Sequence, residues 1–330
     1  MTELSTRELG QSGLAVTTIG LGCNNFGRTG SATETQAGTT AVLDEAVELG
    51  VTLLDTADIY GVPAGTSETL MGVALKGKRY RVLIATKFGH ESYDAGLPDG
   101  LAKGSREYIR LAIDGSLRRL QTDYVDIYLQ HTPDPTVDIA ETLGALDELV
   151  TEGKVRHFGN SNFTAAQLRD ADAASARIGS RRFIVAQDEY SLLERRVEGD
   201  VMPAVRDLGL GFLPYFPLHN GLLTGKFARN IRPADTRIMR QRPHVADNAP
   251  WEKMEAYANL CEQYSVTMLE ATFGWLLSRP EVTSVIAGAT TAEQLRENAD
   301  AANSWHPTTT QVDEISAIFA PVAPDEEKKY

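Results

Sequence analysis

Short apolar runs recur along the chain, and all but one are followed directly by a helical pattern. Each run has the length of a β-strand, and the segments between them carry apolar residues at helical spacing. Strands that alternate with helices predict an α/β fold, and eight such units predict a closed parallel (β/α)8 barrel, the TIM barrel. The runs are Thr18–Gly22, Val51–Leu54, Arg81–Thr86, Tyr124–Leu129, Val155–Phe158, Phe183–Ala186, Gly211–Pro214 and Ser284–Ala287.

Two segments stand outside this alternation. Arg7–Leu9 and Leu14–Val16 flank a Gly-bearing turn, which predicts an N-terminal β-hairpin that closes one end of the barrel. After the seventh strand comes a stretch rich in Pro and Arg without helical or strand period, at about residues 228–249. We expect it to be a long lid loop, and we call it the lid segment. The expected organisation is a single barrel domain over residues 1–330.

An open doubly wound sheet is the alternative fold. It is disfavoured because no Gly-x-Gly-x-x-Gly pattern follows the first strand. A nicotinamide cofactor would therefore need a binding site of another kind in this chain.

Charge and cysteine content exclude several classes of protein. The net charge is −13 and no basic cluster occurs, so nucleic acid and anionic membranes are not expected as partners. The two cysteines, Cys23 and Cys261, are far apart and lack metal-type spacing, so we expect neither a disulfide framework nor a metal. The N-terminus has no signal-peptide core and no apolar run is long enough to span a membrane, which leads us to expect a cytoplasmic protein.

Titratable side chains follow the predicted strands. Asp55 ends the second strand, Tyr60 lies five residues later beside Gly61, Lys87 ends the third strand, and His131 follows the fourth. Barrel enzymes keep their chemistry at the carboxyl ends of the strands. We therefore expect these side chains to meet at one rim.

The four side chains fit a proton-delivery site. A phenol is a poor acid near neutral pH, but a neighbouring ammonium stabilises its anion. Tyr60 would be the acid, Lys87 its activator and Asp55 the group that orients the lysine. His131 would donate a hydrogen bond to the oxygen that receives the proton.

The motifs around these residues resemble those of the aldo-keto reductase superfamily, from the N-terminal hairpin to the last helix. By that resemblance Asp55, Tyr60, Lys87 and His131 are the catalytic tetrad, and the hydride comes from a reduced nicotinamide cofactor that lies across the barrel mouth. The motifs are Asp55–Gly61, Ala85–Gly89, Tyr128–Asp134, Gly159–Phe163, Gln187–Leu193, Gly221–Lys226 and Gly288–Thr291.

The resemblance also assigns the cofactor site. Ser161, Asn162 and Gln187 would hold the carboxamide, and Tyr215 would lie under the nicotinamide ring, where amides and an aromatic face suit these groups. Gly221–Lys226 suits a pyrophosphate. The full expected set is Gly22, Cys23, Asn24, Asp55, Ser161, Asn162, Gln187, Tyr215, Phe216, Pro217, Leu218, Gly221, Leu223, Lys226, Arg237, Ala287, Gly288, Thr290, Gln294 and Asn298.

NADPH is the expected cofactor. The turn before the last predicted helix carries Thr290, and Gln294 and Asn298 follow on that helix, whose N-terminus can hold an anion. By resemblance, Arg237 in the lid segment reaches the same 2′-phosphate of the adenosine ribose. The chain departs from the family pattern at Asn160, Phe216 and Ala287, where the family usually has an apolar residue, a small residue and Pro.

The resulting prediction is an NADPH-dependent reductase of aldehydes and ketones. One alternative is a Schiff-base aldolase that uses Lys87. Another is a cofactor-binding regulatory or interaction subunit, because some relatives in the superfamily serve as channel partners. A small-molecule carbonyl substrate is expected, and Phe26, Tyr93 and Phe163 suggest an apolar or aromatic one. The oligomeric state stays open.

Overall fold

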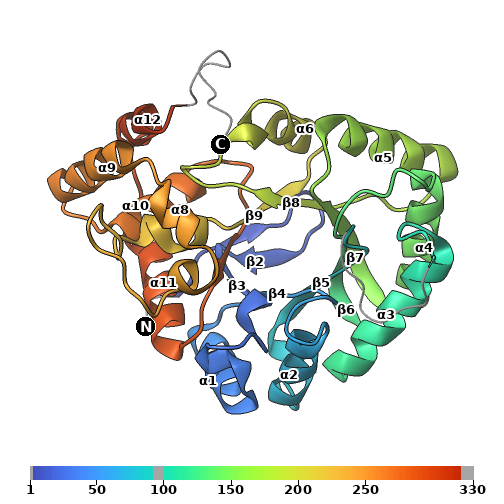
Figure 1. Cartoon of the computed structure of the whole chain (residues 1–330). Coiled ribbons are helices and arrows are strands. Elements are labelled where there is room, and N and C mark those ends of the chain that lie inside the picture. The colour runs from blue at the N-terminus through green and yellow to red at the C-terminus, as the bar shows by residue number, and fades with distance from the viewer. Residues whose placement is uncertain (1–2, 92–99, 321–330) are drawn as a thin grey trace.

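The computed structural model describes residues 3–91 and 100–320, and they form the predicted parallel barrel (Figure 1). Neighbouring strands are parallel in the order β10-β3-β4-β5-β6-β7-β8-β9. The seam closes where the backbone NH of Phe212 donates to the carbonyl of Glu281 and the NH of Thr283 donates to the carbonyl of Phe212. The strands are β3 (Ile19–Gly22), β4 (Leu53–Asp55), β5 (Leu83–Phe88), β6 (Val125–Gln130), β7 (Val155–Ser161), β8 (Val185–Glu189), β9 (Gly211–Tyr215) and β10 (Val285–Gly288).

Helices form a ring outside these strands (Figure 1). None of the helices in the described ranges is both long and apolar enough to cross a membrane. The longer helices are α1 (Gln36–Leu49), α2 (Thr66–Ala74), α3 (Arg106–Leu120), α4 (Ile139–Thr151), α5 (Ala165–Ile178), α6 (Val201–Asp207), α9 (Trp251–Gln263), α10 (Met268–Leu277), α11 (Ala292–Ser304) and α12 (Thr309–Ile318). Short 3-10 turns are η1 (Cys23–Asn25), η2 (Ala32–Glu34), η3 (Arg79–Arg81), η4 (Arg196–Glu198) and η5 (His219–Thr224).

Several helices begin at residues whose side chains accept hydrogen bonds from backbone NH groups of the first turn. Ser105 accepts a hydrogen bond from the backbone NH of Tyr108, and Thr164 forms a capping box with Gln167. Thr291 accepts from the backbone NH of Gln294, but the reciprocal half of a capping box does not form there. The Gln294 amide oxygen accepts instead from the backbone NH and hydroxyl of Thr290, because the preceding turn brings these donors closer.

The N-terminal hairpin pairs β1 (Thr6–Glu8) with β2 (Ala15–Thr17) in antiparallel register. Leu9 and Val16 are fully buried in a cluster with inward-facing residues of the barrel strands. Gly10 lies so close to the start of β9 that an added Cβ would stand 2.6 Å from the Gly211 nitrogen. The hairpin therefore plugs the end of the barrel opposite the rim where the strands finish, as predicted.

The sequence pattern suggested that the lid segment has no regular structure, and this is wrong. It contains two short helices, α7 (Arg237–Gln241) and α8 (Pro243–Asp247). Thr236 caps α7 by accepting from the backbone NH of Met239, and Pro243 begins α8. Helices this short show no clear apolar period, which is why the sequence pattern does not reveal them.

Candidate active site

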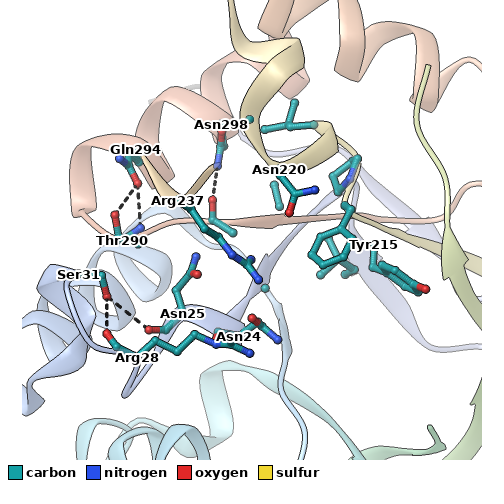
Figure 2. A pocket seen from close by; sticks show the side chains of 18 of the residues that line it. Asn24, Asn25, Arg28, Ser31, Tyr215, Asn220, Arg237, Thr290, Gln294 and Asn298 are labelled. Atoms are coloured by element: carbon teal, nitrogen blue, oxygen red, sulfur yellow. Dashed lines mark hydrogen bonds between the residues drawn. The ribbon is translucent and has the colours of Figure 1, made fainter. Parts of the chain in front are cut away.

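A cavity of about 1200 Å³ opens at the carboxyl ends of the strands. It is lined by loop residues after nearly every strand and by the lid segment, so it collects side chains that are distant in sequence (Figure 2). The predicted site residues that line it are Gly22, Asn24, Asp55, Tyr60, His131, Ser161, Asn162, Gln187, Tyr215, Phe216, Pro217, Leu218, Gly221, Lys226, Arg237, Ala287, Gly288, Thr290, Gln294 and Asn298.

Lys87 lies just beneath the cavity floor, with 1% of its surface exposed. Its ammonium donates to both carboxylate oxygens of Asp55 at 2.8 Å and to the carbonyl of Thr56 at 2.9 Å. The Tyr60 hydroxyl lies 3.4 Å from the same ammonium. Burial alone would lower the pKa of Lys87, but Asp55 and Tyr60 outweigh it and raise the pKa above its ordinary value. The lysine is therefore charged.

The Tyr60 loop is held by α2. The backbone NH of Ser67 donates to the carbonyl of Tyr60 at 3.0 Å. Gly61 has a φ of +95°, and a Cβ there would stand 2.7 Å from the Thr66 side chain. Only glycine fits this turn, and the turn directs the phenol into the cavity, as expected.

His131 is buried beside Tyr60, with ring centroids 6.0 Å apart, and His90 packs edge-on against it at 4.8 Å. Burial, together with the charge of Lys87 and the proximity of His90, holds the pKa of His131 well below its usual range. His131 is therefore a neutral imidazole at physiological pH, and its Nδ1 has no hydrogen-bond partner in the structure.

The residues expected to hold the carboxamide connect to the tetrad. Asn162 donates to the carbonyl of His131 at 2.9 Å and accepts from the Tyr215 hydroxyl at 2.8 Å. Gln187 donates to Asp55 at 2.9 Å. The Gln187 amide thus connects to the carboxylate that holds Lys87, and the Asn162 amide connects to the backbone of His131.

At the far end of the cavity lie Thr290, Gln294 and Asn298, on the turn before α11 and on its first turns (Figure 2). Asn298 donates weakly, at 3.4 Å, to the carbonyl of Gly288. Lys226 lines the cavity as predicted, and it pairs with Glu297 at 3.5 Å.

Arg237, the first residue of α7, lines the cavity from the lid segment. Figure 2 shows its guanidinium pointing toward the side of the cavity that carries Asn24 and Arg28, and away from Gln294. Its Cζ lies 5.6 Å from the centre of the Phe216 ring. Burial lowers the pKa of Arg237 to about 10, and the positive charges of Arg28 and Arg242 add to this effect.

Two predicted cofactor residues, Cys23 and Leu223, belong to the core. Both are fully buried and neither lines the cavity. The reason is that their short turns, η1 and η5, direct these apolar side chains inward, and the Cys23 thiol faces the carbonyl of Leu21.

The expected aromatic rim is also corrected. Phe26 and Phe163 are buried in the core, and Tyr93 lies outside the described residues. The cavity wall near Tyr60 carries Val62 and His90 instead. His90 directly follows the Ala85–Gly89 motif, so the sequence offered a signal for it. Arg28 and Asn25 follow the first strand end and were also missed.

The cavity suits an extended, polar cofactor. The side-chain oxygens of Asn24 and Asn220 are buried at the cavity wall and have no hydrogen-bond partner among the described residues. Such orphaned acceptors fit the donors of a ribose or a carboxamide. No group of three or more potential metal ligands occurs in the part of the chain that the structure describes.

Comparisons with known proteins identify the family of the chain. The aldo/keto reductase family model matches residues 18–320. The probable aldo-keto reductase 1 of Glycine max is 34% identical, over 89% of this chain and 83% of its own. The uncharacterized oxidoreductase YrpG of Bacillus subtilis is 35% identical, over 89% of each chain. The L-glyceraldehyde 3-phosphate reductase of Escherichia coli is 32% identical, over 96% of this chain and 93% of its own. The chain therefore belongs to the aldo/keto reductase family and is an NAD(P)H-dependent oxidoreductase.

Proposed function

We propose that this protein reduces aldehydes or ketones to alcohols, with NADPH as the reductant and Tyr60 as the proton donor. The observation that carries the proposal is the buried Lys87 ammonium, held between the Asp55 carboxylate and the Tyr60 hydroxyl. A bound reduced nicotinamide would supply the hydride to the carbonyl carbon.

The other residues act on the carbonyl oxygen. Tyr60 gives up its proton as negative charge grows on that oxygen, and the charge of Lys87 stabilises the phenolate left behind. His131 is neutral, so one ring nitrogen can donate a hydrogen bond to the same oxygen without adding a positive charge. Its burial beside Tyr60 keeps both donors on one side of the substrate.

A preference for NADPH over NADH is supported by the far end of the cavity. The N-terminus of α11 presents backbone NH groups there, and a Thr290 hydroxyl, which donates to Gln294 in the structure, lies beside them. These are donors that favour a phosphate dianion. Lys226 adds a positive charge at this end of the cavity, although its ammonium also pairs with Glu297.

The structure disfavours an aldolase. A Schiff base requires a neutral, accessible amine, whereas Lys87 is charged and buried in an ion pair with Asp55. A role as a regulatory subunit without turnover receives no specific support from the site geometry.

The test is an absorbance assay at the reduced-nicotinamide band with a panel of aldehydes and ketones. The panel includes glyceraldehyde and glyceraldehyde 3-phosphate, because one relative is named for the phosphorylated compound. We expect cofactor oxidation with at least one carbonyl, and a lower dissociation constant for NADPH than for NADH. Cofactor binding without turnover on any carbonyl would favour the regulatory alternative.

A further inference from the structure

A second, smaller cavity lies between the carboxyl end of β6 and the first turns of α4 and α5, elements that Figure 1 shows side by side. Its volume is about 150 Å³, and it shares no lining residue with the active-site cavity. We call it the outer pocket. Its lining includes Gln130, Asp134, Val137, Phe163 and Asp170.

Gln130 brings an unsatisfied acceptor to the outer pocket. Its neighbour Leu129 packs inside the barrel, and side chains alternate along a strand, so Gln130 points outward toward the helices. The side chain is 2% exposed, and its Oε1 has no hydrogen-bond partner among the described residues. The Thr142 hydroxyl also lines the pocket, but it donates to the carbonyl of Gly104 at 2.7 Å. A buried acceptor without a partner is costly, so a donor that enters the pocket is favoured.

The charge around the outer pocket is negative. Burial alone would raise the pKa of Asp134, but hydrogen bonds from Thr136 and from the Gly104 backbone outweigh it and lower the pKa below its ordinary value. Asp134 is therefore ionised at neutral pH. Asp170 is exposed on α5 and pairs with no cation of the described residues. No lysine or arginine in the described part of the chain lines the pocket.

The walls of the outer pocket limit what can fill it. Val137, Ile139 and the buried Phe163 make part of the lining apolar, which suits a short hydrocarbon stem. A cavity of this volume accommodates a molecule about the size of benzene. An anion would be repelled by the carboxylates, and a wholly apolar molecule would leave the Gln130 oxygen unpaired.

We infer that the outer pocket binds a small organic cation, an alkylammonium or guanidinium group on a short apolar stem. Its N–H groups donate to Gln130, and its charge is balanced by Asp134 and Asp170. Gln130 directly precedes His131, and Phe163 directly follows Asn162, which donates to the His131 carbonyl. The bound cation therefore packs behind the backbone that carries these two active-site residues.

The experiment uses n-propylammonium as the probe, with 1-propanol and propionate as neutral and anionic molecules of similar size. Ligand-observed NMR titration of the whole protein at constant ionic strength gives the dissociation constants. We expect saturable binding of propylammonium, and binding of the other two that is weaker by about tenfold or more. Saturating NADPH should leave the constant for propylammonium unchanged, because the two cavities share no lining residue.

Two variants locate the bound probe. Gln130→Leu removes the acceptor and should weaken propylammonium binding about tenfold, the scale of a lost charge-assisted hydrogen bond. Asp170→Asn removes an exposed charge and should weaken binding about threefold to fivefold. Because Asp170 is exposed, this variant is expected to fold as wild type does and decides the matter if Gln130→Leu does not fold.

Asp172→Asn is the matched control. It removes the same charge from the same helix, but Asp172 pairs with Arg182 and does not line the outer pocket. Its dissociation constant for propylammonium should equal that of wild type.

Four results would overturn the inference. One is equal affinity for propylammonium and 1-propanol, which would make the outer pocket a site for apolar molecules or water only. A second is an equal loss in Asp170→Asn and Asp172→Asn, which would assign the binding to the general negative charge of the surface. The third is unchanged binding in Gln130→Leu. The fourth is displacement of the probe by NADPH, which would place it in the active-site cavity. A protein that binds the probe as expected but does not bind NADPH would contradict the proposed function alone.

Discussion

The charge of Lys87 depends on the groups that surround it. An isolated ammonium at this depth would lose its proton, but Asp55 faces it with both oxygens, and Thr56 adds a carbonyl. The charge is therefore kept directly beside the phenol. Removing either partner of this pair leaves the other charge buried and unpaired, so the arrangement tolerates few substitutions.

Tyr60→Phe is expected to lower carbonyl reduction by at least ~100-fold, the scale of a lost general acid. Cofactor affinity and thermal stability should stay near wild type, because the hydroxyl is one contact at the cavity surface. The measurements are steady-state kinetics, NADPH titration and thermal unfolding. Full activity in this variant would refute the assignment of the proton donor.

Asp188 makes stability depend on pH. It follows Gln187 on β8, so its side chain points to the other face of the strand, and one of its oxygens is buried without a partner. Burial raises its pKa to about 8, despite a hydrogen bond from the Asn162 backbone. The folded state thus holds a proton that the unfolded chain releases near pH 4. Its contribution to stability is present below that pH and is lost as the pH rises toward 8.

Asp188→Asn tests this dependence, since asparagine keeps the shape and cannot ionise. Between pH 5 and pH 8, the free energy of unfolding of wild type should fall relative to that of the variant by ~1 kcal/mol or more. Urea denaturation at both pH values gives the comparison. Parallel pH profiles for the two proteins would show that Asp188 does not titrate in this range.

Single residues were predictable where a strand placed them. Asp55, Lys87 and His131 follow parallel strands, so their convergence is a consequence of the barrel. Arg28 follows a strand end by several loop residues, and its direction depends on a carbonyl that only the folded loop presents. Cys23 was expected at the cofactor, but a motif position does not tell whether backbone or side chain faces the site, and the Cys23 side chain is buried.

At the scale of elements, the strands and most long helices follow from apolar spacing and capping residues, as the α5 capping box illustrates. The short helices α7 and α8 could not be predicted from apolar spacing, because a single turn is too short to show a period. Helix α7 has the Thr236 cap and packs against η5 and α8, and its Arg237 lies over Phe216, just before η5; Pro243 begins α8.

The backbone of the lid segment is expected to become more protected from hydrogen exchange when cofactor binds, since α7 lines the cavity that would hold the cofactor. Backbone amides of residues 228–249 should exchange more slowly in saturating NADPH, while amides in the centre of α3 should be unchanged. Hydrogen exchange followed by mass spectrometry measures both. Identical exchange of the lid segment with and without NADPH would contradict lid closure.

Across the whole molecule, one end of the barrel carries the candidate active site and the other end is closed by the hairpin. The rim where the strands finish carries the cavity, and the opposite end carries the hairpin plug with Leu9 at its centre. Changes to the plug should therefore affect stability without changing the chemistry at the rim.

Leu9→Ala is expected to lower the free energy of unfolding by about 2–5 kcal/mol, the cost of a buried leucine. Activity per folded molecule should stay as in wild type. Leu111→Ala is the control, because Leu111 on α3 is 37% exposed and should cost under ~1 kcal/mol. Chemical denaturation and kinetics separate the two effects. A loss of kcat in folded Leu9→Ala would show that the two ends are coupled.

The hairpin plug also sets an order of events during synthesis on the ribosome. Its residues leave the ribosome before the barrel strands, yet the side chains that cover Leu9 and Val16 include Val185, Leu213 and Ile286, which are made much later. The plug cannot finish packing until the last strand, β10, has been translated. Nascent chains halted before residue 285 would therefore leave two apolar hairpin residues incompletely covered, which makes the hairpin a place for chaperones to act.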